Sequence, residues 1–168
     1  MSYTDRFLLL DALIGHLDTV VPVLPDPFLR SQHVGFLTVS VVTVFELSIK
    51  DIFLEFSRKK NGAFGTYCGN VMEKMNGRIS LRDLREVHVP KFGEKYLAKF
   101  RKKLEVQEQV FLRSSGFSVK SSYGNVVVWR NSFAHEGVLP VNATYAETCK
   151  GYDAGKIVLR CLAESMIR

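Results

Sequence analysis

The stretch VGFLTVSVVTVFELSIKDIFLEF, residues 34–56, is the longest patterned segment of the chain. Its large apolar residues recur every three or four positions, the spacing of one face of an α-helix. They are Val34, Leu37, Val41, Phe45, Ile49, Ile52 and Phe56. The β-branched residues at 39–44 would suit a strand, but the periodic run is too long for one. Asp26-Pro27 suits the start of a helix, and the cations at 58–60 suit its C-terminal end. We therefore predict one long helix here.

Further helices are expected on both sides of this segment. Residues 4–20 are apolar at helical spacing, and three prolines then separate them from the long helix. Residues 61–69 contain three glycines and suggest a loop, residues 71–84 are weakly patterned, and a better helix begins near Lys91. After a polar connection at 114–122, one helix runs from Ser122 to a stop at Gly137, and Thr144 caps the last helix. The prediction is an all-α, up-and-down helical bundle of one domain, residues 1–168, with a partly helical insertion at about 61–120.

The composition of the chain limits the classes of protein to which it can belong. The chain has 168 residues, 46% hydrophobic and 24% charged, which is ordinary for a soluble globular domain. The charges of Glu46, Lys50 and Asp51 leave residues 34–56 unable to span a bilayer, and no signal peptide opens the chain. The three cysteines lack Cys-x-x-Cys spacing, so we expect a cytoplasmic protein without disulfides, bound metal, cofactor or membrane contact. The net charge of +6 favours an anionic partner such as nucleic acid.

The sequence Arg-Asn-Ser-Phe-Ala-His at 130–135 is the strongest candidate for a site. Histidine exchanges protons near neutral pH, and arginine binds phosphate. Asn131 and His135 are four residues apart and share a helix face, while Arg130 lies about 140° from His135 around the axis. The long arginine side chain can bend back toward a shared cleft. By spacing alone, the pair could equally cap or salt-bridge the end of the helix.

The surroundings of this motif resemble a known family. Arg-Asn-x-x-x-His ends the penultimate predicted helix, and a short turn and one more helix follow. Tyr-Gly-Asn-Val-Val-Val-Trp at 123–129, Ala-His-Glu-Gly at 134–137 and the long helix with Glu46 and Lys50 add to the match. Together they are similar to the HEPN superfamily (higher eukaryote and prokaryote nucleotide-binding domains), which consists of small α-helical bundles. The likeness covers most of the chain and is weakest at 61–120.

The resemblance implies a metal-independent endoribonuclease with Arg130, Asn131 and His135 as catalytic residues. It also implies a homodimer whose two motif helices form a composite groove, and a role as a toxin or phage-defence enzyme, with an antitoxin or defence-system protein as a possible partner. One HEPN subgroup is controlled by modification of a tyrosine in His-x-Tyr, but this chain has Gly137 there. The alternative function is a non-catalytic HEPN module that binds RNA or a nucleotide, or mediates assembly.

Two other groups have both a structural and a functional interpretation. Glu46 and Lys50, four residues apart, form either an ion pair within the helix or polar groups beside the motif groove. A second set of lysines recurs every four residues and forms either a solvated helix face or a track for an RNA backbone. These residues are Lys91, Lys95, Lys99 and Lys103.

Overall fold

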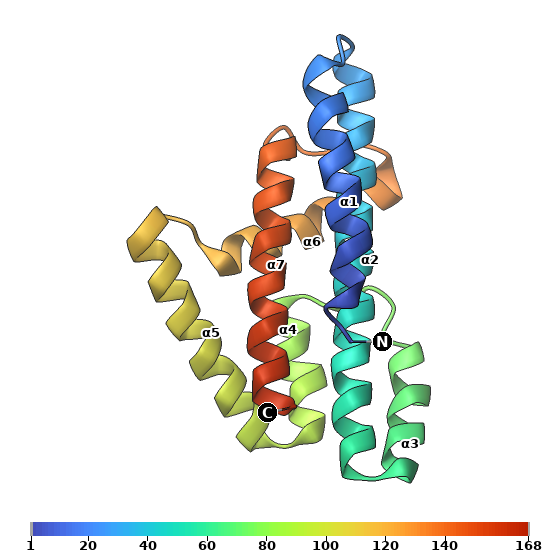
Figure 1. The fold of residues 1–168 in the computed structure, drawn as a ribbon, viewed down its shortest axis with the longest axis vertical. Helices are drawn as coiled ribbons and strands as arrows, with labels where there is room; N and C mark the ends of the chain where they lie inside the picture. Colours follow the sequence, from blue (N-terminus) through green and yellow to red (C-terminus); the bar gives the residue numbers. More distant parts are fainter. Residues whose placement is uncertain (1, 168) are drawn as a thin grey trace.

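Helices make up most of the computed structural model, which describes residues 2–167 (Figure 1). They are α1 (Asp5–Val20), α2 (Pro27–Lys60), α3 (Gly62–Glu73), α4 (Leu81–Asp83), α5 (Glu94–Ser115), α6 (Val119–Glu136) and α7 (Tyr145–Met166). No strand occurs within the described residues, so the predicted all-α class is confirmed. None of the helices in this part of the chain is long and apolar enough to cross a bilayer.

The long helix α2 lies at the centre of the arrangement. In Figure 1, α1 and α7 run beside it, α3 folds back along its C-terminal half, and α6 crosses behind α7 and α2. The start predicted for α2 is confirmed, because the Asp26 side chain accepts a hydrogen bond of 2.8 Å from the backbone N–H of Phe28, and Pro27 is the first helical residue. The predicted end is also confirmed, since α2 ends at Lys60.

Residues 62–69 belong to helix α3, so the predicted loop at 61–69 is wrong. Asn61 caps α3 through its side-chain oxygen, which accepts hydrogen bonds from the N–H groups of Ala63 and Phe64 at 2.8 and 3.4 Å. Gly65 lies so close to α2 that a Cβ atom there would be 3.3 Å from the Cα atom of Arg58. This glycine therefore permits two helices to pack closely and does not mark a turn.

The boundaries around α5 and α6 also differ from the prediction. α5 begins at Glu94, after Gly93 with φ of +118°, and it continues to Ser115. α6 begins at Val119, three residues earlier than expected, because the Ser118 hydroxyl caps it. The segment at 61–120 contributes to the common core, where Phe100 is fully buried.

Aromatic packing joins α2 to α6 and α7. The Phe45 ring of α2 lies against Gly155 of α7, at a place that any side chain on Gly155 would occupy. The same ring stacks on Tyr123 of α6 at 5.5 Å and on Tyr152 of α7 at 6.2 Å between centroids. The Tyr123 hydroxyl donates a 2.6 Å hydrogen bond to the carbonyl of Ile79, so the segment before α4 is held to the same centre.

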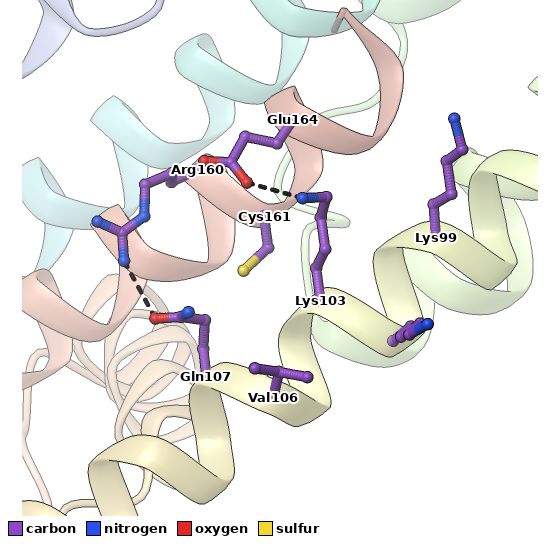
Figure 2. A pocket seen from close by; sticks show the side chains of 8 residues that line it. Lys99, Lys103, Val106, Gln107, Arg160, Cys161 and Glu164 are labelled. Carbon is purple, nitrogen blue, oxygen red and sulfur yellow. Dashed lines mark hydrogen bonds and ion pairs between the residues drawn. The ribbon is translucent and has the colours of Figure 1, made fainter.

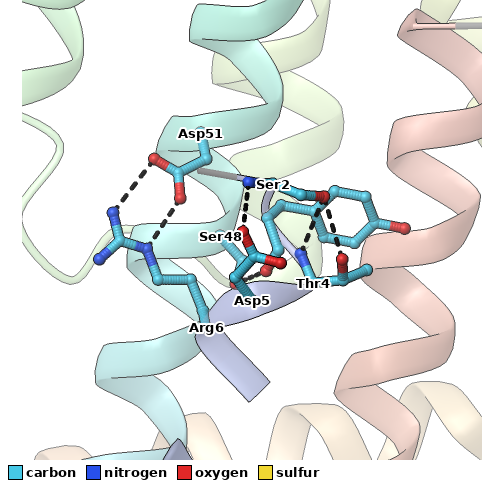
Figure 3. Close-up of polar contacts among 7 residues, drawn as sticks. Ser2, Thr4, Asp5, Arg6, Ser48 and Asp51 are labelled. Atoms are coloured by element: carbon cyan, nitrogen blue, oxygen red, sulfur yellow. Dashed lines mark hydrogen bonds and ion pairs between the residues drawn. The ribbon is translucent and has the colours of Figure 1, made fainter. Parts of the chain in front are cut away.

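Polar contacts fix the start of α1 on α2 (Figure 3). Arg6 makes two hydrogen bonds to the carboxylate of Asp51, at 2.8 and 3.3 Å. One turn away, the Ser48 hydroxyl donates to the carbonyl oxygen of Tyr3 at 3.2 Å. A bidentate arginine–carboxylate pair fixes direction as well as distance, so α1 is held in one orientation along α2.

Burial of His88 makes stability depend on pH. His88 is 5% exposed, its Nε2 donates to the carbonyl of Arg78 at 2.7 Å, and burial lowers its pKa. The unfolded chain therefore takes up a proton at His88 at a higher pH than the folded protein does, and the free energy of unfolding decreases as pH falls below about 6.5.

Urea denaturation at pH 5.5 and 7.5 tests this assignment. We expect the difference in unfolding free energy between the two pH values to be smaller in H88Q than in the wild type. The matched variant H16Q changes an exposed histidine, and equal pH differences in all three proteins would contradict this assignment.

Candidate active site

Arg130 continues the core-facing side of α6. The buried residues of this helix include Val119, Tyr123, Val126 and Val127, and Arg130 follows on the same side one turn later, half-buried. Its guanidinium lies against Gly77, where a Cβ atom would be 2.5 Å from Nη2. Gly77 also has φ of +73°, a conformation that favours glycine. The turn before α4 therefore leaves room for the arginine.

Glu46 of α2 lies next to this arginine. One carboxylate oxygen accepts the N–H of Gly77 at 2.7 Å, and the other accepts from Lys50 Nζ at 2.7 Å. Burial opposes ionisation of this carboxyl, but Lys50, the Gly77 N–H and the charge of Arg130 together hold the pKa of Glu46 below its usual value. Glu46 thus forms the ion pair within α2 and also carries negative charge beside Arg130.

Asn131 and His135 lie on the opposite, solvent-exposed side of α6. The half-buried Gly124 and the exposed Val128 share that side. Within residues 2–167, the side chains of Asn131 and His135 make no hydrogen bond or ion pair. The backbone of Gly137, in the left-handed conformation, ends the helix with a 2.9 Å hydrogen bond to Phe133. The capping role that spacing alone allowed for this histidine is therefore absent.

Within one chain, Arg130 and His135 point to different surroundings. Arg130 faces Gly77 and Glu46, whereas His135 faces solvent about 140° away around the helix axis. Asn131 and His135 are the pair that the helix brings together. A site that uses all three residues needs a substrate, or a second chain, that reaches across the end of α6.

The end of α6 is held in place by close packing on α2. Phe133 lies over Gly35, in the space that a side chain at position 35 would fill. Trp129, the single tryptophan of the chain, is 4% exposed on the same helix. Sequence patterns do not reveal Gly35 and Gly77 as positioning residues, because a helical period does not indicate which glycine contacts which side chain.

The predicted lysine track is interrupted in the structure. Lys91 lies in a short 3-10 turn, Val89–Phe92, before α5 begins, so it does not share a helix face with the other three lysines. Lys95 lies over the ring of Tyr96, 4.9 Å from its centroid. Lys99 and Lys103 line a groove between α5 and α7.

No group of three or more His, Cys, Asp or Glu side chains in residues 2–167 could hold a metal ion.

The family model described as RiboL-PSP-HEPN matches residues 2–168. The chain belongs to the RiboL-PSP-HEPN family. The resemblance to the HEPN superfamily is thereby confirmed, and the match includes the segment at 61–120, where the likeness in sequence was weakest. HEPN domains are commonly of ribonuclease type. No curated protein and no solved structure shows a significant match. The roles of Arg130, Asn131 and His135 stay predictions.

Filling the space at Gly35 tests how packing positions the motif. In G35A, the new methyl group displaces Phe133, and we expect a loss of about 1–3 kcal/mol in unfolding free energy together with a shift of Trp129 fluorescence. The control is G15A on α1, where nothing lies within 4 Å of an added Cβ. Alanine is the better helix former, so G15A gains up to about 1 kcal/mol. Unchanged stability and fluorescence in G35A would contradict the packing described here.

Proposed function

We propose that this HEPN protein is a metal-independent endoribonuclease. The observation that carries the proposal is the arrangement at the end of α6, where Arg130 is held beside Glu46 while Asn131 and His135 stand open to solvent. A fixed cation and a free imidazole on one rigid helix are the groups that phosphodiester cleavage needs. Because the histidine ring has no partner within the described residues, a substrate can reach it without breaking an existing contact.

RNA supplies its own nucleophile in the 2′-hydroxyl next to the scissile phosphate. As that oxygen attacks phosphorus, its proton passes to a general base, and the departing 5′-oxygen receives a proton from a general acid. His135 performs proton transfer, Arg130 stabilises the negative charge that develops on the phosphate oxygens, and Asn131 donates a hydrogen bond to the phosphate. The products are a 2′,3′-cyclic phosphate and a 5′-hydroxyl end.

The reaction needs a general base and a general acid, which two histidines could supply, but one chain has only His135 at the end of α6. The exposed side of α6 suits contact with a second copy, because Gly124 has no side chain to keep a partner helix away and Val128 is 59% exposed beside Asn131 and His135. A two-fold symmetric contact along this side would bring both motifs to one groove. The proposed enzyme is therefore a homodimer with a composite site.

A ribonuclease of this kind fits a toxin or phage-defence system, with an antitoxin or defence-system protein as its partner. Gly137 stands where one HEPN subgroup has its modified tyrosine, so control by modification at that position is not part of the proposal. The anionic substrate agrees with the net charge of +6.

Cleavage of RNA in the presence of EDTA tests the chemistry. We expect H135A and R130A each to lower the cleavage rate at least about 100-fold, because one loses proton transfer and the other loses charge stabilisation. H16A, a change of an exposed histidine on α1, is expected to leave the rate unchanged. The 3′ ends of the products should carry a cyclic phosphate.

Activity that survives H135A would refute the mechanism. RNA that is bound by the wild type and stays intact would instead identify the alternative function, a non-catalytic module that holds RNA.

The dimer is tested by placing a charge on the exposed side of α6. In V128E, two carboxylates would meet at the proposed contact, so we expect sedimentation to change from dimer to monomer and cleavage to be lost, with the helical circular dichroism retained. V110E on α5 is the matched control, since Val110 is 51% exposed and lies far along the chain from the motif. A wild-type protein that sediments as a monomer while it cleaves RNA would exclude the composite site.

A further inference from the structure

We propose that the groove between α5 and α7 binds the sugar–phosphate backbone of RNA, at a place separate from the motif at the end of α6. The choice of RNA among polyanions rests on the proposed function, whereas the groove and its charge do not. Figure 2 shows the two walls, with Lys99, Lys103 and Gln107 on α5 and Arg160 and Glu164 on α7. The groove has a volume of about 1000 Å³.

The helix that forms one wall of the groove begins in a strongly basic segment, and four cations and one carboxylate line the groove itself. Between residues 91 and 103, six side chains are basic and only Glu94 is acidic, which gives this segment a net charge of +5 out of +6 for the whole chain. Lysines at 95, 99 and 103 are each four residues apart on a helix, a spacing at which like charges destabilise the helix. Repulsion among these lysines lowers the stability of the free protein, and the phosphates of a bound polyanion would relieve it.

The cations of the groove are available to a ligand. Within residues 2–167, Lys99 and Lys102 are exposed and form no ion pair. Arg160 donates to the neutral side chain of Gln107 at 3.2 Å, so its positive charge is not neutralised. Lys103 is the exception, since it donates to Glu164 at 2.9 Å. Elsewhere on the surface lysines are commonly paired, as Lys150 is with Glu147 and Lys156 is with Asp11.

The form of the groove favours a nucleic acid backbone over an acidic protein. Successive lysines on α5 are displaced by about 6 Å along the helix axis, a spacing comparable to that of neighbouring phosphates. Val106 is the only exposed large apolar side chain among the lining residues, so the buried apolar anchor that protein partners usually need is missing.

The groove and the motif lie on different parts of the fold. Arg160 is fifteen residues after Tyr145, the first residue of α7, which corresponds to about 22 Å along the helix. α7 itself begins just after the turn that follows the motif helix. The groove would therefore hold nucleotides several positions away from the bond that is cut, and it would raise affinity without taking part in the chemistry.

The test measures binding of a fluorescent 2′-O-methyl RNA of about 12 nucleotides, which carries the full backbone charge but cannot be cleaved by 2′-hydroxyl attack. The variant K99Q/K102Q removes two unpaired cations. We expect it to bind about tenfold more weakly at moderate salt, and the slope of log affinity against log salt to fall by about 0.7 for each lost cation. The matched control is K60Q/R113Q, which removes two exposed cations that form no ion pair within the described residues and do not line the groove, and it should bind as the wild type does.

E164Q gives a change in the opposite direction. It removes the one carboxylate of the groove and frees Lys103, so we expect tighter binding of the same RNA. A purely structural role of these residues would not make one substitution strengthen binding and another weaken it. Equal affinities of the wild type and K99Q/K102Q would overturn the proposal. Binding of a glutamate-rich peptide of equal charge at the groove, without binding of RNA, would also overturn it, because the ligand would then be an acidic protein.

These outcomes are independent of catalysis. If RNA binds at the groove but the natural RNA is never cut, the ribonuclease proposal fails and the groove stands. If RNA is cut and K99Q/K102Q binds normally, the groove proposal fails alone.

Discussion

The contact between Phe45 and Gly155 is the constraint on which the rest of the structure depends. The ring occupies the space that a side chain on α7 would take, and it also stacks on Tyr123 of α6 and Tyr152 of α7. Three helices thereby share one buried centre. Because protein interiors are packed to nearly crystalline density, a shift of Phe45 cannot be absorbed locally and would move α6 relative to α2.

That same packing determines where the candidate site lies. Arg130 continues the buried side of α6 one turn after Val126, so its guanidinium is directed to Gly77 and Glu46 by the orientation that the core imposes on the helix. Phe133 on Gly35 fixes the final turn. His135, on the other side, is left in solvent. The core therefore orients the side chain of Arg130, while the surroundings of His135 depend on what binds to the exposed side of α6.

The two proposed surfaces, one for catalysis and one for RNA binding, lie on separate elements. The proposed chemistry uses groups at the end of α6, and the proposed RNA contact uses the cations of the groove between α5 and α7. Repulsion among the lysines of α5 is offset by burial of the other side of that helix, where Phe100 and Leu104 are fully buried. Such a helix tolerates a concentrated charge because its apolar side, and not its surface, holds it in place.

The sequence by itself determined the helices whose signals are local. The apolar period of α2, the Asp26 cap and the stop at Gly137 act through neighbouring residues, and all three were predicted. The glycines at 62, 65 and 69 suggest a loop in the sequence, but they lie in α3, where Gly65 allows the helix to approach α2 closely and that approach is not visible in sequence. The motif residues were found from sequence, but the direction of each was decided only by tertiary structure, which set Arg130 against Gly77 and Glu46. The groove likewise joins Lys99 and Lys102 to Arg160, residues about sixty positions apart. Helical periodicity and helix caps depend on residues close together in the sequence, whereas contacts between distant segments exist only after the helices have packed.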